Sequence, residues 1–233
     1  MKSAIYFVFM PSIFFLFSMT AYSQIGIKGG LGVSDIVFAV EGQTPYLGYE
    51  INYLTHRNPL VTYQFGVFGT VKINRLFNFQ PELIYARQGL NYNIEFLYDD
   101  ITYRLYLNYL QLPLLMNLSM RPQKKFHPGF YVGPYGALKL HAKRITKIDG
   151  ERVEENPSNV KNGDFGLIGG LSFDFDMPNG QLIAELRFNY SLINIMYPID
   201  GFIPSYDGPD LDEERARNVS LALLIGYRFQ NIK

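Results

Sequence analysis

The chain has 233 residues, no cysteine, and a formal net charge of +0 from 21 basic and 21 acidic residues. The lack of cysteine excludes disulfides, thiolate metal sites and a cysteine-linked lipid anchor, and the balanced charge gives no basic footprint for nucleic acid. Aromatic residues make up 16% of the chain and charged residues only 18%. This composition suits a protein that meets lipid or that covers two hydrophobic surfaces.

The first predicted element is an export signal. Lys2 precedes an apolar stretch, and the triplet 21–23 (Ala-Tyr-Ser) places small residues where a signal peptidase cuts. The apolar stretch is short for a helix that spans a membrane. We therefore expect cleavage before Gln24 and predict that residues 1–23 are a signal peptide.

After the signal, apolar and polar side chains alternate with a period of two. This period places two sets of side chains on opposite faces of a β-strand. One face is apolar and often aromatic, and the other mixes charged residues, glycine and tyrosine. The expected strands, in chain order, are 25–34, 61–72, 77–88, 109–118, 130–141, 164–175, 182–190 and 218–229.

Eight strands with one apolar face are typical of bacterial outer-membrane barrels, which have an even strand number. A soluble sandwich or calycin-like barrel would also alternate, but aromatic residues near the strand ends favour the membrane, where they form interface girdles. The aromatic residues in question are Tyr63, Phe77, Tyr85, Phe130, Phe175, Tyr190, Tyr227 and Phe229.

The connections between these strands alternate between long and short. The long ones cover 35–60, 93–103, 142–162 and 194–216, and the others cover 74–76, 119–127 and 177–180. Outer-membrane barrels have long outer loops and short periplasmic turns. We therefore predict an all-β fold for residues 24–233, namely an eight-stranded antiparallel up-and-down transmembrane β-barrel with long extracellular loops and short periplasmic turns.

Several short motifs point to one family. They are Gly-Ile-Lys-Gly-Gly at 26–30, Gln-Pro-Glu-Leu at 80–83, Leu-Gln-Leu-Pro-Leu at 110–114, Gly-Pro-Tyr at 133–135 and Gly-Tyr-Arg-Phe at 226–229. In order and spacing the chain resembles the outer-membrane β-barrel domain family of Bacteroidetes, known as the porin family or PorT family. The resemblance implies a bacterial outer-membrane location, and one branch of that family assists secretion and gliding machinery.

The predicted lumen carries charges of both signs. The interior of an eight-stranded barrel is just wide enough for side chains to fill. Isolated charges there would be costly, so we expect them to pair. A salt-bridged plug is favoured, and a narrow ion path or gated pore is the alternative. The expected lumen charge network contains Lys28, Lys72, Glu82, Lys139, Asp174, Glu185, Arg187 and Arg228, with Asp164 also facing inward.

A catalytic site requires a nucleophile, a base and an orienting group within reach of one another. His56 and His127 fall in predicted connections on opposite sides of the membrane, and His141 lies near the outer end of its strand with Asp164 as a neighbour on the next. Because no serine is well placed beside them, we predict that the protein is not an enzyme and has no catalytic residue, metal or cofactor.

Two outer loops have unusual compositions. The first, from Ile36 to Tyr53, is apolar, which favours a cap on the barrel over a partner surface. The last carries an acidic cluster whose carboxylates could hold calcium. Its spacing does not match an EF-hand loop, so a solvated acidic loop is favoured. The cluster consists of Asp207, Asp210, Asp212, Glu213 and Glu214.

The leading functional hypothesis is therefore a non-enzymatic integral outer-membrane protein with a side-chain-filled lumen. Its long outer loops indicate a structural or envelope-complex accessory role. The alternatives are a small pore or solute-binding porin and, less favoured, a lipid-modifying enzyme. The expected partners are outer-membrane lipid, lipopolysaccharide and an envelope or secretion complex, and no nucleic acid.

Overall fold

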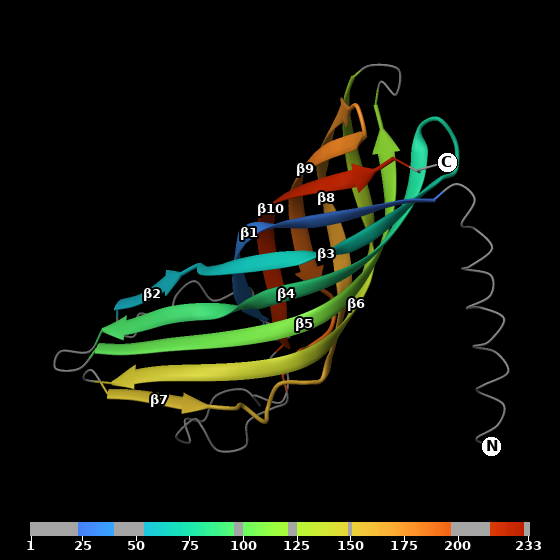
Figure 1. The fold of residues 1–233 in the computed structure, drawn as a ribbon. Coiled ribbons are helices and arrows are strands. Elements are labelled where there is room, and N and C mark those ends of the chain that lie inside the picture. The colour runs from blue at the N-terminus through green and yellow to red at the C-terminus, as the bar shows by residue number, and fades with distance from the viewer. Residues whose placement is uncertain are drawn as a thin grey trace, which may run out of the picture.

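We describe the protein from a computed structural model that places residues 23–39, 54–95, 100–120, 125–148, 151–196 and 215–230 (Figure 1). No helix in these ranges is long and apolar enough to cross a membrane. The strands are β1 (Ser23–Ala39), β2 (Leu54–Asn58), β3 (Leu60–Lys72), β4 (Phe77–Glu95), β5 (Asp100–Ser119), β6 (Phe126–Ile148), β7 (Glu151–Glu155), β8 (Gly163–Met177), β9 (Gly180–Ser191) and β10 (Arg215–Phe229).

Eight of these strands form a closed antiparallel ring in the order β1-β3-β4-β5-β6-β8-β9-β10. The ring closes where β1 pairs with β10, from Gly26 opposite Arg228 to Ala39 opposite Arg215. The two extra strands lie beside the ring, β2 against β4 and β7 against β6. The predicted eight-stranded up-and-down barrel is confirmed, and closure leaves no free edge in the ring itself.

The two faces of the barrel have opposite polarity, which reverses the arrangement in soluble proteins. Leu31, Leu223 and Ile225 point outward, each with 67% of its surface exposed, whereas Glu82 and Arg187 are buried inside at 2% and 0%. Such an apolar exterior is the lipid-facing band expected of a transmembrane barrel. The outward set follows the predicted alternation on all eight ring strands.

Aromatic side chains group near both ends of the lipid-facing surface, as membrane-interface girdles do. Near one end, the rings of Phe126 and Phe175 lie 4.9 Å apart between centroids. Near the other, the rings of Phe65 and Tyr85 stack at 5.0 Å.

The short connections gather at one end of the barrel, which we call the turn end, and the long ones at the other, the loop end. β1 starts and β10 finishes at the turn end, beside the 73–76 and 178–179 turns. The strands continue further into the loop end than predicted. The 93–103 connection is mostly a β4–β5 hairpin, and the 142–162 connection holds the end of β6 and all of β7. The backbone ladder continues there although the lipid-facing alternation has stopped.

Strands β4, β5 and β6 are the longest strands of the ring. They contain 19, 20 and 23 residues, whereas about 9–11 residues suffice to span a bilayer. Together with β2 and β7 they form an extended sheet, here called the wall, that projects at the loop end (Figure 1). Pro59, which has no N–H for a ladder, separates β2 from β3.

Three predicted features lie outside the described residues. They are the signal peptide apart from Ser23, the acidic cluster of 207–214, and the 40–53 part of the apolar first loop. We predicted that Ile36 begins this loop. In the structure Ile36 belongs to β1 and is fully buried inside the barrel.

The inverted polarity generates a first prediction. Leu114 lies in the middle of the outward-facing series of β5 and is 41% exposed, so Leu114→Arg is expected to destabilise the membrane-inserted barrel by about 2–4 kcal/mol. Urea-dependent unfolding in lipid vesicles measures this. Val153→Arg in β7 is the control, because that side chain lies outside the ring, and an equal loss in both variants would contradict a lipid-facing Leu114.

Candidate functional site

The centre of the lumen holds four charged side chains in mutual contact. Lys28 comes from β1, Glu82 from β4, and Glu185 and Arg187 from β9. Lys28 Nζ lies 2.8 Å from Glu82 Oε1 and 2.5 Å from Glu185 Oε1. Arg187 donates to both oxygens of Glu82, at 2.8 and 3.0 Å, and to Glu185 Oε2 at 2.8 Å. We call these four residues the central network.

The central network is electrically balanced and almost completely buried. It contains two cations and two carboxylates, and none of the four side chains is more than 3% exposed. Gln80 Nε2 donates a further hydrogen bond to Glu82 at 2.7 Å. Buried charges are tolerated when they are paired and hydrogen-bonded in this way. The network therefore ties together three strands of the ring and blocks the middle of the lumen.

Two aromatic rings also hold the cations. Lys28 Nζ lies 4.6 Å from the centre of the Phe68 ring, and the guanidinium of Arg187 lies 5.5 Å from that of Tyr131. Gly170 makes room for Tyr131, since a Cβ there would approach the tyrosine hydroxyl to 2.6 Å. Interaction with the ring faces adds to the electrostatic stabilisation of buried cations.

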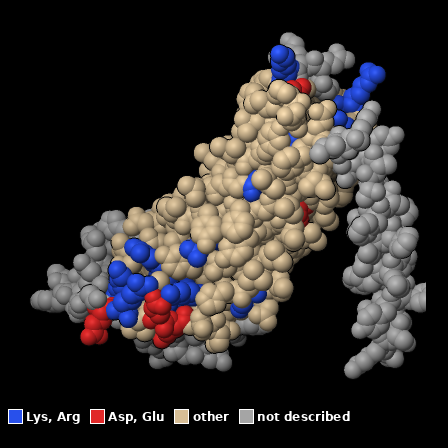
Figure 2. All heavy atoms as spheres, in the orientation of Figure 1, with Lys and Arg blue, Asp and Glu red and all other residues tan. Residues whose placement is uncertain are grey.

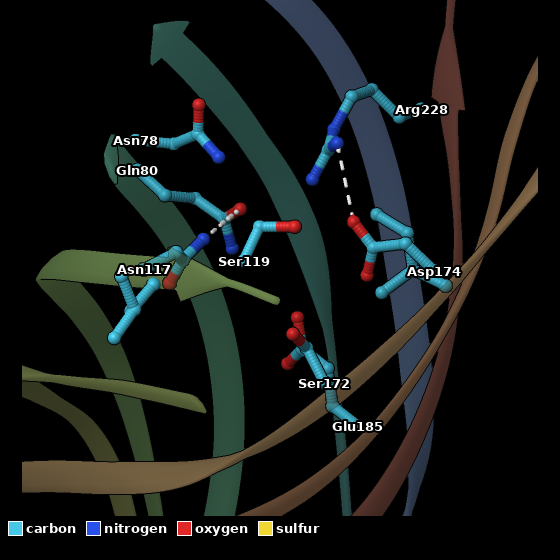
Figure 3. Close-up of a pocket in the computed structure, with 10 residues that line it drawn as sticks. Asn78, Gln80, Asn117, Ser119, Ser172, Asp174, Glu185 and Arg228 are labelled. Carbon is cyan, nitrogen blue, oxygen red and sulfur yellow. Dashed lines mark hydrogen bonds and ion pairs between the residues drawn. The ribbon is translucent and has the colours of Figure 1, made fainter. Parts of the chain in front are cut away.

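Below the central network, a polar pocket faces the turn end (Figure 3). Arg228 Nη1 lies 3.3 Å from Asp174 Oδ2 on one side of the pocket, and Asn117 donates to Gln80 at 2.8 Å on the other. Glu185, a member of the central network, also lines the pocket. We call this pocket the vestibule.

Above the central network, the lumen contains a further carboxylate, Asp164, in a different environment. Asp164 is buried and accepts hydrogen bonds from Tyr135 Oη at 3.0 Å, Ser191 Oγ at 2.5 Å and Asn218 Nδ2 at 3.2 Å. All three donors are neutral. The carboxylate is satisfied by hydrogen bonds alone, which favours a packing role for this group.

The loop end of the interior is apolar. A buried cluster joins the inner face of the wall to segments that cross the mouth of the barrel, where Val160 and Ile195 are 2% and 0% exposed. Its members are Ile36, Leu90, Leu105, Leu107, Tyr109, Ala142, Val160, Ile195 and Ala216. Charged, hydrogen-bonded and apolar layers thus succeed one another along the lumen.

The structure separates the predicted lumen charges into groups. Lys28, Glu82, Glu185 and Arg187 meet at the centre, and Asp174 pairs with Arg228 nearer the turn end. Lys72 does not join them, because it is exposed at the end of β3. Lys139 lies near the loop end, where its ammonium donates to the carbonyl of Val160.

The histidine predictions need correction. His127 belongs to β6 rather than to a connection and lies 3.0 Å from Asp176 Oδ2, and His56 belongs to β2. His141 does not face Asp164. A β-bulge shifts the β5–β6 register beside Asn108, so His141 is exposed on the outer surface. One inserted residue moves all following side chains to the other face.

Sequence reasoning did not include three contributors to the central network, Gln80, Tyr131 and Phe68. Gln80 and Tyr131 lie on the inward face by the period-two pattern, so their direction was available from the sequence. Phe68 occupies the same inward series as Gln64 and Thr70, but an aromatic residue on a barrel strand more often faces lipid. Among the described residues, no cluster of three or more His, Asp or Glu side chains is suited to hold a metal ion.

Residues 16–197, more than half of the chain, match the family described as outer membrane protein beta-barrel domain. The chain belongs to this family. The protein therefore lies in the bacterial outer membrane, with its turn end toward the periplasm and its loop end outside the cell. No curated protein matches the chain.

Solved structures of outer-membrane proteins are similar at low sequence identity. OprG from Pseudomonas aeruginosa is 16% identical with a TM-score of 0.44, and the match covers 90% of this chain and 97% of that chain. Ail of Yersinia pestis is 14% identical with a TM-score of 0.37, covering 89% and 99%. Neisserial surface protein A is 14% identical with a TM-score of 0.39, covering 89% and 97%.

The central network generates a second prediction. Glu82→Ala removes the carboxylate that Lys28 and Arg187 share and leaves two buried cations with one counter-ion, so the barrel should lose about 3–5 kcal/mol of stability. Unfolding by urea in vesicles measures the loss. Glu155→Ala serves as the matched control, because Glu155 is exposed and its pair with Arg144 spans 3.6 Å, so its change should stay within about 1 kcal/mol. Similar losses would show that the central pairs contribute no more than a surface pair.

Proposed function

We propose that the protein is a non-enzymatic barrel of the outer membrane, with a closed lumen, that acts at its loop end as an accessory of an envelope complex. The filled interior carries this proposal. The proposal includes removal of the signal peptide at residues 1–23 before assembly. It also includes the role suggested by the resemblance to the PorT family of Bacteroidetes, one branch of which assists secretion.

The closed lumen is supported by three successive layers. Glu185 lines the vestibule, the central network crosses the middle, and the apolar cluster with Val160 and Ile195 fills the loop end. An ion would have to displace buried, paired charges and then cross an apolar layer, which is costly. A barrel of this kind serves as a membrane anchor for what it presents outside.

The accessory role is supported by the edges of the wall. Among the described strands, β2 pairs only with β4 and β7 only with β6. All five residues of β7 are exposed. A free strand edge offers backbone donors and acceptors to which a partner segment can add a strand. The wall therefore presents a docking edge outside the membrane.

A non-enzymatic role is supported by the place of His141. This residue was the only candidate base for a lipid-modifying site near Asp164, and it faces the opposite side of the sheet. Ser191 Oγ lies 2.5 Å from Asp164 Oδ1, but among the described residues no histidine contacts either side chain. The geometry needed for nucleophilic catalysis is therefore incomplete in this part of the chain.

A narrow hydrated pore remains the second candidate, because one observation favours it. The buried side-chain amides of Gln64, Gln111 and Asn189 have no hydrogen-bond partner among the described residues. Buried amides of this kind are ordinarily satisfied by water. A proton or ion path through the barrel would also require water beside the central network.

Conductance distinguishes the two candidates. The folded protein in a planar bilayer is expected to show no channel steps, because the lumen layers leave no continuous aqueous path, while a general porin in the same bilayer gives steps. Conductance that disappears when Arg187 or Glu185 is replaced would establish the pore instead.

Crosslinking in intact cells tests the accessory role. A photo-crosslinking amino acid at Val153, which is 49% exposed in β7, is expected to capture a reproducible envelope protein. The same group at Met177, which is 43% exposed at the turn end, is the control and should not capture it. The role is wrong if neither position captures a partner and cells lacking the protein keep a normal envelope.

A further inference from the structure

The outer surface of β4, β5 and β6 changes from mainly apolar to mainly polar within one row, and Leu140, 52% exposed at the bulge of β6, lies at this boundary. Tyr85, Leu110 and Leu138 form one row across the three strands. The next row toward the loop end contains Arg87, Asn108 and His141. His141 joins this row because of the bulge described above. The change marks where the lipid-facing band stops and the headgroup region begins.

Basic side chains continue on the same face beyond this row. Figure 2 shows Lys and Arg gathered over the loop ends of the wall strands with Asp and Glu among them, while most of the remaining face is uncharged. We define the basic patch as Arg87, Arg104, Lys143, Lys147 and Arg152. A hydrogen bond from Lys143 lowers the pKa of Glu154, so this carboxylate stays ionised and offsets one of the five cations.

Arg87 is held in a fixed orientation. Its Nε donates to Asn108 Oδ1 at 3.1 Å, and its guanidinium lies 4.7 Å from the ring centre of Tyr63 and 5.2 Å from that of Tyr106. Within the described part of the chain, its two terminal nitrogens have no hydrogen-bond partner. The arginine is positioned by Nε and the rings, which leaves the terminal fork for a ligand.

Arg104 repeats this arrangement on the neighbouring strand. Its Nε donates to Asn91 Oδ1 at 3.1 Å, and its terminal nitrogens likewise have no partner in the ranges that the structure places. Arg104 lies in the row of Asn91, four residues beyond the row of Arg87. Four residues along a strand correspond to about 13 Å. The two forks are thus separate anion sites on one face.

We propose that the basic patch binds the phosphate groups of a phosphorylated glycolipid in the outer leaflet. A guanidinium fork matches the geometry of a phosphate in a bidentate contact. The two forks suit a headgroup with two phosphates on a sugar backbone, and Lys143 and Lys147 add attraction at the membrane surface. The acyl chains of the same lipid would lie along Leu110 and Leu138, which are 37% and 55% exposed.

This ligand accounts for the position of the patch. A basic surface meant for a soluble anion would have no reason to begin in the row next to the apolar band. A glycolipid requires a surface that contacts its phosphates on the loop-end side and its hydrocarbon chains on the side of the apolar band. Binding would fix the rotation and depth of the wall in the membrane independently of any protein partner, so this inference goes beyond the proposed accessory role.

The test measures lipid binding by the full-length protein in nanodiscs, with titration followed by native mass spectrometry. The probes are a bisphosphorylated lipid A, the same lipid A after dephosphorylation, and phosphatidylglycerol. The intact lipid A is expected to bind tightest. The double variant R87Q and R104Q should weaken it by ~10-fold or more, because it removes charge-assisted hydrogen bonds. Lys72→Gln removes a cation at the turn end and should leave the affinity unchanged.

Controls for folding and for the role of the guanidinium group accompany this test. Slower gel mobility after boiling shows that each variant is folded, and K143Q with K147Q provides a second test on exposed side chains if the arginine variant does not fold. Arg87→Lys keeps the charge but loses the fork, so an intermediate affinity is expected. The proposal is overturned if dephosphorylated lipid A binds equally well, if phosphatidylglycerol matches the bisphosphorylated lipid, or if the patch variants bind like the wild type.

Discussion

Hydrocarbon offers no hydrogen bonds to a polypeptide, so a sheet in a membrane must pair every strand on both sides. In this protein the requirement is met by the pairing of β1 with β10, which joins the two ends of the barrel domain. With eight strands in the ring, the interior is too narrow for bulk water and is filled by side chains. The buried charges of the lumen must therefore find their counter-ions inside the barrel.

The central network is the consequence of that narrow interior. Charges on three different strands neutralise one another at distances of 2.5 to 3.0 Å, and the arrangement leaves no net charge in the lumen centre. Removing a cation or a carboxylate of the network leaves a buried charge unpaired, which is costly. The network therefore fixes the relative positions of β1, β4 and β9. The same contacts that stabilise the barrel also obstruct its lumen, which links its stability to the closed lumen that we propose.

The loop end is where the barrel departs from a minimal ring. The long strands β4, β5 and β6 carry the sheet out of the lipid on one side only, and this asymmetry gives the wall two different surfaces. Among the described strands, β2 and β7 each pair on one side only, and the other edge of each is suited to a protein partner. The outer face of the wall carries Arg87 and Arg104 beyond the apolar band. These features support our proposal that the barrel acts through its surroundings rather than through its lumen.

The sequence by itself determined the strand count, the order of the connections and the direction of nearly every ring side chain, because a period of two in a strand fixes its faces whatever the neighbours are. Only the tertiary structure decided which charges meet. Lys28 and Glu82 are 54 residues apart, and the register that joins them depends on closure. The sequence also did not determine how far along the barrel each charged side chain lies. Lys72 and Lys139 are on the predicted strands but lie near opposite ends of the barrel. The bulge that turns His141 outward is an extra residue of β6 relative to its partner β5. The alternation within a single strand cannot predict such a shift.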